Sequence, residues 1–263
     1  MLLKDKVVMI SGIGPGMGVK LAIEAAREGA KALAIAARTA EKLDDAEQRV
    51  RALGVDCKII KVPTDIADPT QCKNLVATTI AAFGRIDGLV NSAYFHGNFE
   101  AIEGGDLELW KQSFNTNVIG SIELSRACAP HMKAQGSGAI VMINTMATMK
   151  PVPGEAGYAA SKGALTTATK YLALELGPQN IRVNAARMGW MWGVPVQNAL
   201  KEWAQAQHST LEQMVAGVAQ NIALRRIVTD DECARAALFL ISDYASAITG
   251  AILDVNGGEF LPS

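Results

Sequence analysis

The sequence predicts an α/β fold, in which helices cover both faces of a seven-stranded parallel sheet within one doubly wound domain. Short apolar or β-branched runs alternate along the chain with longer segments of helical periodicity. Hydrophobic residues make up 49% of the 263 residues and charged residues 19%, which suits a sheet that is buried on both faces. No internal repeat or linker rich in Pro, Gly or Ser divides the chain, so we expect residues 1–263 to form a single domain.

Seven runs are expected to be strands, because they are short, apolar or β-branched, and separated by helical segments. They lie at Lys6–Ser11, Ala32–Ala37, Cys57–Val62, Gly88–Ser92, Ala139–Asn144, Arg182–Ala186 and Ala251–Val255. Six segments are expected to be helices, several of which follow Thr, Asp or Pro in capping positions. They lie at Met17–Glu28, Ala40–Leu53, Pro69–Phe83, Leu107–Gln135, Gly157–Leu176 and Asp230–Ser242. The region around 188–224 is the least regular, and we expect a substrate loop with small helices there.

Charge, cysteines and the N-terminus exclude several classes of protein. The 25 Lys and Arg residues balance the 26 Asp and Glu residues, which leaves no broad basic surface for nucleic acid or anionic lipid. The four cysteines form no metal-binding pattern, so we expect reduced structural thiols and no bound metal. No signal-peptide cleavage pattern is present, and no apolar run approaches the roughly 20 residues that span a bilayer. These features predict a cytoplasmic protein without nucleic-acid or membrane partners.

A glycine-rich loop follows the first expected strand and leads directly into a helix. The segment Ser11–Gly18 reads SGIGPGMG and matches a GxxxGxG spacing through Gly12, Gly16 and Gly18. It does not match GxGxxG, because the sixth position counted from Gly12 is Met17. A strand, a glycine loop and a helix N-terminus together form an anion site, since free amides and the helix dipole face the same point. A turn that only requires glycine torsions is the alternative, and the position at the first βα junction favours a dinucleotide pyrophosphate.

Tyr158 and Lys162 lie four positions apart in an expected helix, so their side chains share one helix face. A phenol has a reference pKa near 10 and is a poor acid–base group at neutral pH, but a neighbouring cation stabilises phenolate and lowers that pKa. An isolated YxxxK pair is usually an ordinary surface pair. Here the hydroxyl of Thr145 lies thirteen residues before the tyrosine, at the end of an expected strand, which favours a catalytic group.

Further motifs follow in the order found in a known superfamily. They are Asp65 after the third strand, Asn91-Ser92-Ala93, Asn117 within FNTNV, Arg182-Val183-Asn184, Thr249-Gly250 and Asp254–Gly258. With the glycine loop and the YxxxK pair, these motifs make the chain resemble the short-chain dehydrogenase/reductase superfamily from Val7 to Gly258. The resemblance implies a Rossmann-like domain with a seven-stranded parallel sheet, which agrees with the strands counted above.

The resemblance implies hydride transfer between a nicotinamide cofactor and a ketone or secondary alcohol. By resemblance, Tyr158 is the general acid/base, and Lys162 lowers its pKa and holds the nicotinamide ribose. Thr145 takes the place of the family's serine, and Asn117 anchors a water of the proton relay. Asp65 is expected to contact the adenine ring. The expected cofactor-binding set is Ser11, Gly12, Gly16, Met17, Gly18, Arg38, Asp65, Ile66, Asn91, Ala93, Tyr158, Lys162 and Gly189.

Two departures from the family pattern occur. Tyr94 stands where many members have the glycine of Asn-Asn-Ala-Gly, so we expect a differently shaped loop, because a tyrosine cannot take the torsions of glycine. Met188-Gly189 replaces the usual Pro-Gly after the sixth strand, which changes the expected nicotinamide contacts. His96 is interpreted as an ordinary loop histidine, with a supplementary proton donor as the alternative, because no carboxylate adjacent in the sequence would orient it.

The end of the second strand bears on the choice of cofactor. Ala37 stands where NAD-preferring members carry an acidic residue that accepts hydrogen bonds from the ribose hydroxyls. Arg38 can pair with a 2′-phosphate as a planar charged fork. The sequence therefore favours NADP(H) over NAD(H). A solvated Arg38 is the alternative, since the glycine loop has no second basic residue.

The expected substrate is a small carbonyl or alcohol compound. Its binding residues are expected to be Tyr94, Met146, Trp190 and Trp192. Thioethers beside indoles suit a bulky apolar ligand, alicyclic or steroid-like, whereas lid packing or a subunit contact is the alternative for the same side chains.

Two long segments, Leu107–Gln135 and Gly157–Leu176, match the helices that pair between subunits in related oligomers, so we expect a homo-oligomer, either a dimer or a homotetramer. Two other functions stay open. A non-catalytic dinucleotide sensor conflicts with the retained Tyr158 and Lys162, and an enoyl reductase usually has a wider gap between the tyrosine and the lysine than the three residues found here.

Overall fold

The computed structural model describes residues 1–261, and its centre is a seven-stranded sheet in the order β3-β2-β1-β4-β5-β6-β9. The strands are β1 (Val7–Ser11), β2 (Ala32–Ala37), β3 (Lys58–Pro63), β4 (Gly88–Asn91), β5 (Gly138–Thr145), β6 (Ile181–Met188) and β9 (Ile252–Val255). All neighbouring pairs are parallel, which confirms the predicted fold class. The strand order reverses between β1 and β4, and folds of this kind bind ligands in the crevice outside the carboxyl ends of such strands.

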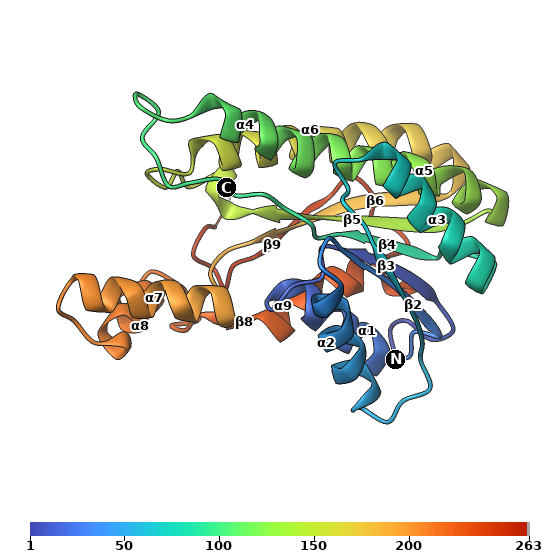
Figure 1. The fold of residues 1–263 in the computed structure, drawn as a ribbon, viewed down its shortest axis with the longest axis horizontal. Coiled ribbons are helices and arrows are strands. Elements are labelled where there is room, and N and C mark those ends of the chain that lie inside the picture. Colours follow the sequence, from blue (N-terminus) through green and yellow to red (C-terminus); the bar gives the residue numbers. More distant parts are fainter. Residues whose placement is uncertain (262–263) are drawn as a thin grey trace.

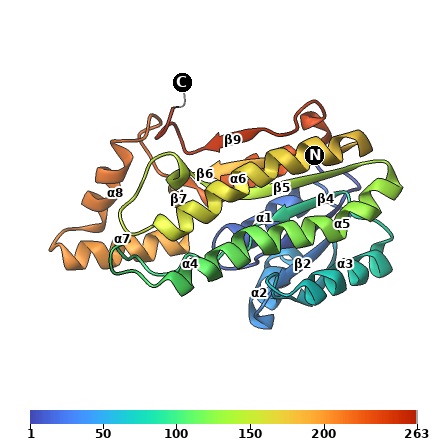
Figure 2. The same ribbon diagram turned by 90° about the horizontal axis from the view of Figure 1, so that it is seen from above.

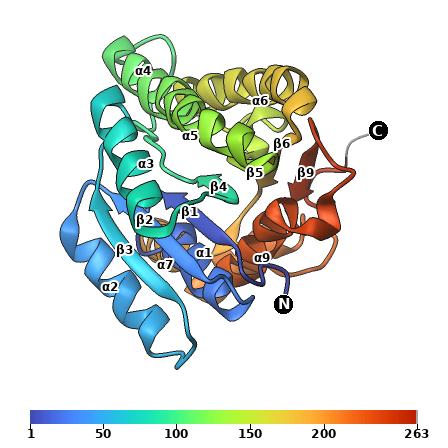
Figure 3. The same cartoon turned by 90° about the vertical axis from the view of Figure 1, so that its right-hand side faces the viewer.

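Helices cover both faces of the sheet (Figure 1, Figure 3). One face carries α1 (Met17–Arg27), α2 (Ala40–Arg51) and α9 (Asp230–Ile241). The other face carries α3 (Pro69–Phe83), α4 (Leu107–Phe114), α5 (Ser121–Gln135) and α6 (Ala156–Leu176). One apolar core lies on each face of the sheet. Successive residues of β2 alternate between them, since Leu33 and Ile35 belong to the core under α1, α2 and α9, and Ala34 and Ala36 belong to the second core, under α3, α5 and α6. Both faces of the strand are therefore buried, as its continuous apolar run predicts.

Local capping explains why several helices begin and end where the sequence predicts. The Asp68 side chain accepts hydrogen bonds from the first turn of α3, with Pro69 at its first position, and Gly84 ends the helix with φ 76°. Thr229 and Glu232 form a capping box at the start of α9. Among residues 1–261, no helix combines the length and the apolarity needed to cross a bilayer.

The segment Leu107–Gln135 is helical throughout, as predicted, but it is not a single α-helix. α4 ends at Phe114, a π-helical segment spans Asn115–Gly120, and α5 follows. Gly120 packs closely against the β3–α3 connection, because a Cβ at this position would lie only 2.7 Å from the carbonyl oxygen of Ile66. π-helical turns are frequent at functional sites, and this one contains Asn117, whose side chain is completely buried.

The region predicted to be irregular contains two helices, α7 (Val194–Ala206) and α8 (Leu211–Ala219), which project beyond one end of the sheet (Figure 2). We call residues 188–224 the lid segment. A two-stranded parallel ribbon was not predicted: β7 (Met191–Trp192) pairs with β8 (Val228–Thr229) and ties the start of the lid segment to the residues just after it. Such short strands leave no periodic signal in the sequence.

Candidate active site

The glycine loop lies against the end of β4 at backbone contact. Gly12 has φ 83°, and a Cβ there would lie 2.2 Å from the amide nitrogen of Ala93. A Cβ at Gly18 would lie 2.2 Å from the carbonyl oxygen of Gly12. Neither position has room for a side chain. At Gly16, by contrast, a Cβ would meet the ring of Pro195 at 3.4 Å, so the start of α7 lies beside this part of the loop.

The first turn of α1 is open to a ligand. Gly16 occupies the N-cap position, and no side chain of the described residues accepts a hydrogen bond at this helix start. Met17 begins the helix and, like Gly18, is buried. Uncapped amides at the positive end of a helix dipole attract an anion, so this helix start is compatible with the pyrophosphate site that the sequence predicts.

Two buried polar atoms mark the same crevice. Ser11 Oγ and Asn91 Oδ1 have no hydrogen-bond partner among the described residues. The two residues are paired across β1 and β4 at the carboxyl ends of the strands. The Asn91 amide nitrogen is used, since it donates to Ser125 Oγ at 3.1 Å. A buried polar atom without a partner is costly, so the crevice fits a ligand with polar groups of its own, as a dinucleotide has.

The residues expected near the adenosine part of the cofactor lie at the ends of β2 and β3. Ala37 is buried, whereas Arg38 is exposed and forms no ion pair with any of residues 1–261. Asp65 folds back on its own loop, because its Oδ1 accepts from the Ala67 amide at 3.0 Å. Ile66 belongs to the second apolar core, so a cofactor contact there would involve its backbone.

Tyr158 and Lys162 share the inner face of α6, as the spacing predicts. Lys162 is 2% exposed, its Nζ donates to the carbonyl oxygen of Ile143 at 2.8 Å, and the same Nζ lies 5.9 Å from the centre of the Tyr158 ring. Burial lowers the pKa of Lys162 from 10.5 to about 7. The lysine therefore gains and loses its proton near neutral pH.

The Tyr158 phenol has a raised pKa and keeps its proton at neutral pH. Burial raises the pKa of Tyr158, Tyr94 and Glu155 raise it further, and a hydrogen bond with the Thr145 side chain lowers it. Part of the ring surface stays open to solvent, which moderates the effect of burial. The Thr145 hydroxyl, at the end of β5, also accepts from the Ala147 amide at 3.2 Å. The structure thus brings together the three side chains that the sequence assigns to acid–base chemistry.

Asn117 joins this group to the loop after β4. Its Oδ1 accepts from the Phe95 amide at 2.7 Å, and its Nδ2 donates to the Phe95 carbonyl at 2.9 Å and to Ser161 Oγ at 2.9 Å. Both ends of the side-chain amide are occupied. The water that the resemblance assigns to Asn117 would therefore contact its backbone.

The residues expected to bind substrate divide into two groups. Tyr94 is 55% exposed, and its ring lies 6.2 Å from that of Tyr158, whereas Met146 is almost fully buried below the site. Trp190 and Trp192 pack against the small apolar core of the lid segment, and Trp190 also meets Trp203 edge to face at 6.0 Å. For the two tryptophans the contacts match the alternative interpretation, lid packing.

The two departures from the family pattern have local explanations. Tyr94 has no positive φ, so the loop after β4 follows an ordinary backbone path that a tyrosine can take. Gly189 is required by packing, because a Cβ there would lie 2.7 Å from the Cβ of Asn256. Within residues 1–261, no group of three His, Cys, Asp or Glu side chains could hold a metal ion.

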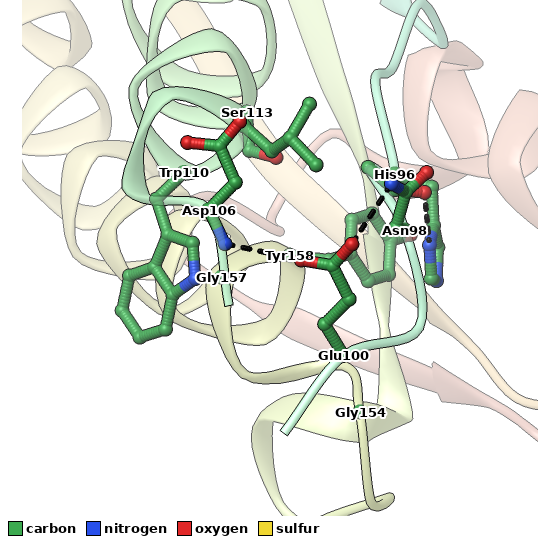
Figure 4. Close-up of a pocket in the computed structure, with 11 residues that line it drawn as sticks. His96, Asn98, Glu100, Asp106, Trp110, Ser113, Gly154, Gly157 and Tyr158 are labelled. Carbon is green, nitrogen blue, oxygen red and sulfur yellow. Dashed lines mark hydrogen bonds between the residues drawn. The ribbon is translucent and has the colours of Figure 1, made fainter. Parts of the chain in front are cut away.

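Sequence reasoning missed the surroundings of His96, which lines a small polar cavity together with Tyr158 (Figure 4). The imidazole lies parallel to the phenol ring, with centroids 4.6 Å apart. A carboxylate does lie near it, since Nε2 is 3.8 Å from Oε1 of Glu155. The interpretation of His96 as an ordinary loop histidine considered only neighbours in the sequence, and Glu155 comes from the N-cap of α6.

A glycine loop at an uncapped helix start, together with a phenol beside a buried lysine, indicates a dinucleotide-dependent oxidoreductase. Comparison with known proteins gives the family. The family model described as Enoyl-(Acyl carrier protein) reductase matches residues 12–259, and the chain belongs to this family of the short-chain dehydrogenase/reductase superfamily.

Similar proteins cover almost the whole chain. Levodione reductase of Leifsonia aquatica is 28% identical over 256 residues, which are 97% of this chain and 94% of the relative. The structure of L-sorbose reductase from Gluconobacter frateurii, complexed with NADPH and L-sorbose, superposes with a TM-score of 0.93 at 28% identity and covers 100% and 99% of the two chains. NAD+-bound xylitol dehydrogenase gives a TM-score of 0.88 at 29% identity, over 98% and 100%. The chain is an NAD(P)-dependent oxidoreductase that acts on alcohol or ketone groups.

Proposed function

We propose that this protein is an NADP(H)-dependent enzyme that interconverts a bulky apolar ketone and the corresponding secondary alcohol. The observation that carries the proposal is the convergence of Tyr158, Lys162 and Thr145 at the end of the crevice. A non-catalytic sensor could use Lys162 to bind the cofactor, but it would have no need of the Tyr158 phenol beside the lysine and the Thr145 hydroxyl.

The roles of the side chains follow from their proton affinities. Tyr158 keeps its proton at neutral pH and donates it to the oxygen of a ketone as negative charge develops there. The Thr145 hydroxyl donates a hydrogen bond to the same oxygen. A bound nicotinamide cofactor supplies or accepts the hydride. Lys162 in its charged form favours phenolate, which the reverse reaction needs as a base.

The residues that would hold the cofactor are those of the crevice. The uncapped start of α1 suits the pyrophosphate, and Ser11 and Asn91 offer polar atoms that lack partners in the described residues. Ala37 cannot accept from a ribose hydroxyl, and exposed Arg38 has a free guanidinium for a 2′-phosphate. Both NADPH and NAD+ occur among the similar structures, so the preference for NADP(H) rests on these two residues.

The preference for an apolar substrate rests on exposed side chains of two loops. Tyr94 and Phe99 follow β4 and are 55% and 62% exposed, and Met149 and Val152 follow β5 and are 47% and 43% exposed. The two loops meet, since the Glu100 amide donates to the Gly154 carbonyl at 3.2 Å. Exposed apolar groups beside a catalytic residue favour a ligand that buries them.

The test is a screen of alicyclic and steroid ketones, polyols and an enoyl thioester, each with NADPH and NADH, by nicotinamide absorbance. Tyr158→Phe should lose roughly 10³-fold or more in kcat on the best ketone. The dissociation constant of NADPH should change by less than about threefold, because the ring is retained. Tyr244→Phe, an exposed tyrosine far along the chain, is the matched control. Comparable turnover in Tyr158→Phe, or turnover of the enoyl thioester alone, would contradict the proposal.

We further propose a homo-oligomer, a dimer or a tetramer, formed through α6 and the segment before α5. Ile119, Tyr171 and Leu174 are 51%, 62% and 74% exposed there, which is unusual for large apolar side chains. Sedimentation at micromolar concentration should show an oligomer that Leu174→Glu dissociates and that Tyr244→Glu leaves intact. A monomeric wild type would contradict this assembly.

A cytoplasmic location is part of the same proposal. All four cysteines are free, and three of them are buried. Burial raises the pKa of Cys72 to about 11 and that of Cys233 to about 12, so these thiols are unreactive at neutral pH. Free thiols are typical of a reducing compartment.

A further inference from the structure

The catalytic phenol is in contact with a ring that the roles above do not use. The imidazole of His96 lies over Tyr158 with centroids 4.6 Å apart and an angle of 30° between the planes, a stacked arrangement. The ring of Phe99 lies 4.6 Å from the same imidazole. His96 is therefore held between the catalytic residue and an exposed side chain of the loop after β4, at the edge of the cavity in Figure 4.

Two oxygen atoms face the edges of the imidazole. Nε2 lies 3.8 Å from the Glu155 carboxylate, and Nδ1 lies 3.4 Å from the carbonyl oxygen of Gly97. Both oxygens are acceptors, so a neutral imidazole, which has one N–H, donates to one of them, and an imidazolium donates to both. Because Glu155 immediately precedes α6, it links the histidine to the helix that carries Tyr158.

The cation and the other aromatic ring near the phenol lie farther from it than the imidazole does. Lys162 Nζ and the Tyr94 ring lie 5.9 Å and 6.2 Å from the centre of its ring, and the Thr145 side chain lowers the pKa of its hydroxyl. One side of the ring borders the small polar cavity. An aromatic ring beside open space needs a partner on its face if it is to keep one orientation.

We propose that His96, anchored by Glu155, is a positioning residue that stacks on Tyr158 and holds the phenol oxygen where it transfers its proton. This inference rests on the proposed function. Displacing a catalytic group by about 1 Å can cost about 10²-fold in rate. Loss of the stack therefore lowers kcat, while the dissociation constant of NADPH changes little, since the residues expected at the pyrophosphate and the adenosine lie at the start of α1 and the ends of β2 and β3.

Two substitutions at His96 test whether the aromatic face of the side chain, and not its volume alone, positions the phenol. His96→Leu removes the aromatic face, and we expect kcat to fall roughly 10- to 100-fold. His96→Phe keeps a ring in the same place, and we expect kcat within about threefold of wild type. The KM for the ketone should change less than kcat in both variants. An equal loss of kcat in the two variants, or no loss in His96→Leu, would overturn the proposal.

A double-mutant cycle tests the anchor. Glu155→Gln should lower kcat about three- to tenfold in wild type and should have no further effect beside His96→Leu, because the carboxylate acts through the imidazole. The same loss in both backgrounds would show that Glu155 acts on Tyr158 directly and would contradict the anchor. His131→Gln, in α5, is the matched control and should leave kcat unchanged.

A spectroscopic measurement keeps this inference separate from the proposed function. The chain has three histidines, so His131→Gln and His208→Asn assign the imidazole resonances of His96 by elimination. The ring currents of Tyr158 and Phe99 should both shift the carbon-bound ring protons of His96. The contribution of Tyr158 should persist in Tyr158→Phe and be lost in Tyr158→Leu, which leaves only that of Phe99. An active enzyme without this shift would overturn the inference alone. A shift without any carbonyl turnover would overturn the proposed function and, with it, the catalytic role of His96.

Discussion

The two sides of the crevice are built from different contacts. On the cofactor side, backbone lies against backbone, so that Gly12 and Gly18 have no space for a Cβ. On the substrate side, the contacts are between side chains of separate loops, as in the stack of His96 on Tyr158. Large apolar groups such as Tyr94 and Phe99 remain exposed there, whereas Ser11 and Asn91 on the cofactor side are buried.

This difference determines which substitutions each side of the crevice tolerates. A position where a Cβ would lie 2.2 Å from backbone atoms permits only glycine, so the cofactor side is fixed by geometry. A contact between exposed side chains can be rebuilt by substitution without disturbing the sheet, because loops tolerate change. We therefore expect substitutions on the cofactor side to alter folding or cofactor binding, and substitutions on the substrate side to alter kcat or KM for the ketone.

The largest effect should come from Gly12→Ala, which combines a positive φ with a collision against the Ala93 amide. Strain and overpacking together should lower the free energy of unfolding by about 3 kcal/mol or more. Gly14→Ala is the matched control, because a Cβ there has no neighbour within 4 Å, and its change should stay within about 0.5 kcal/mol. Urea unfolding at one protein concentration measures both. Equal stability of the two variants would break the distinction between the two sides.

The next effect concerns the choice of cofactor. Arg38→Ala should weaken NADP(H) roughly 10- to 100-fold more than NAD(H), because a guanidinium–phosphate contact is lost with only one of them. Ala37→Asp should shift the preference towards NAD(H), since its carboxylate repels the 2′-phosphate and accepts from a free 2′-hydroxyl. Dissociation constants for both cofactors provide the measurement. An unchanged ratio in Arg38→Ala would mean that Arg38 is a solvated loop residue.

The sequence predicts most of the fold and the cofactor side, for physical reasons. Short continuous apolar runs such as β2, placed between helical segments, favour strands buried on both faces, and backbone contacts leave glycines at fixed spacing. The π-helical segment Asn115–Gly120 was not predicted, because hydrophobic periodicity does not report a local shift of hydrogen bonds. Trp190 and Trp192 could be placed only by the structure, since a tryptophan suits a binding pocket and a packed lid equally.

A smaller effect should be visible in the pH dependence of stability. Burial lowers the pKa of Lys162 from 10.5 to about 7, so between these values the unfolded chain binds a proton that the folded chain has lost. The free energy of unfolding therefore rises with pH in this window. One proton taken up on unfolding gives a slope of about 1.36 kcal/mol per pH unit, so the rise from pH 7 to pH 9 is about 2 kcal/mol. Above pH 9 the buried thiols, whose pKa values are raised, act in the opposite direction.

Lys162→Met tests this assignment, because methionine fills a similar volume without a charge. The rise between pH 7 and pH 9 should be absent in the variant, and thermal or urea unfolding at several pH values measures it. Parallel curves for the variant and the wild type would show that Lys162 does not lose its proton on folding in this range.

The smallest effect should come from Thr145→Ser, on the substrate side. The serine keeps the hydroxyl that contacts Tyr158 and accepts from the Ala147 amide, and it loses a methyl group and the restriction of χ1 that β-branching gives. We expect kcat and KM for the ketone within about threefold of wild type, since one methyl group contributes little to a half-open site. Thr145→Val keeps the shape but leaves the phenol and the Ala147 amide without their partner, so its kcat should fall well below that of Thr145→Ser. If the two variants lose activity equally, the methyl group matters as much as the hydroxyl, and the substrate side is packed as tightly as the cofactor side.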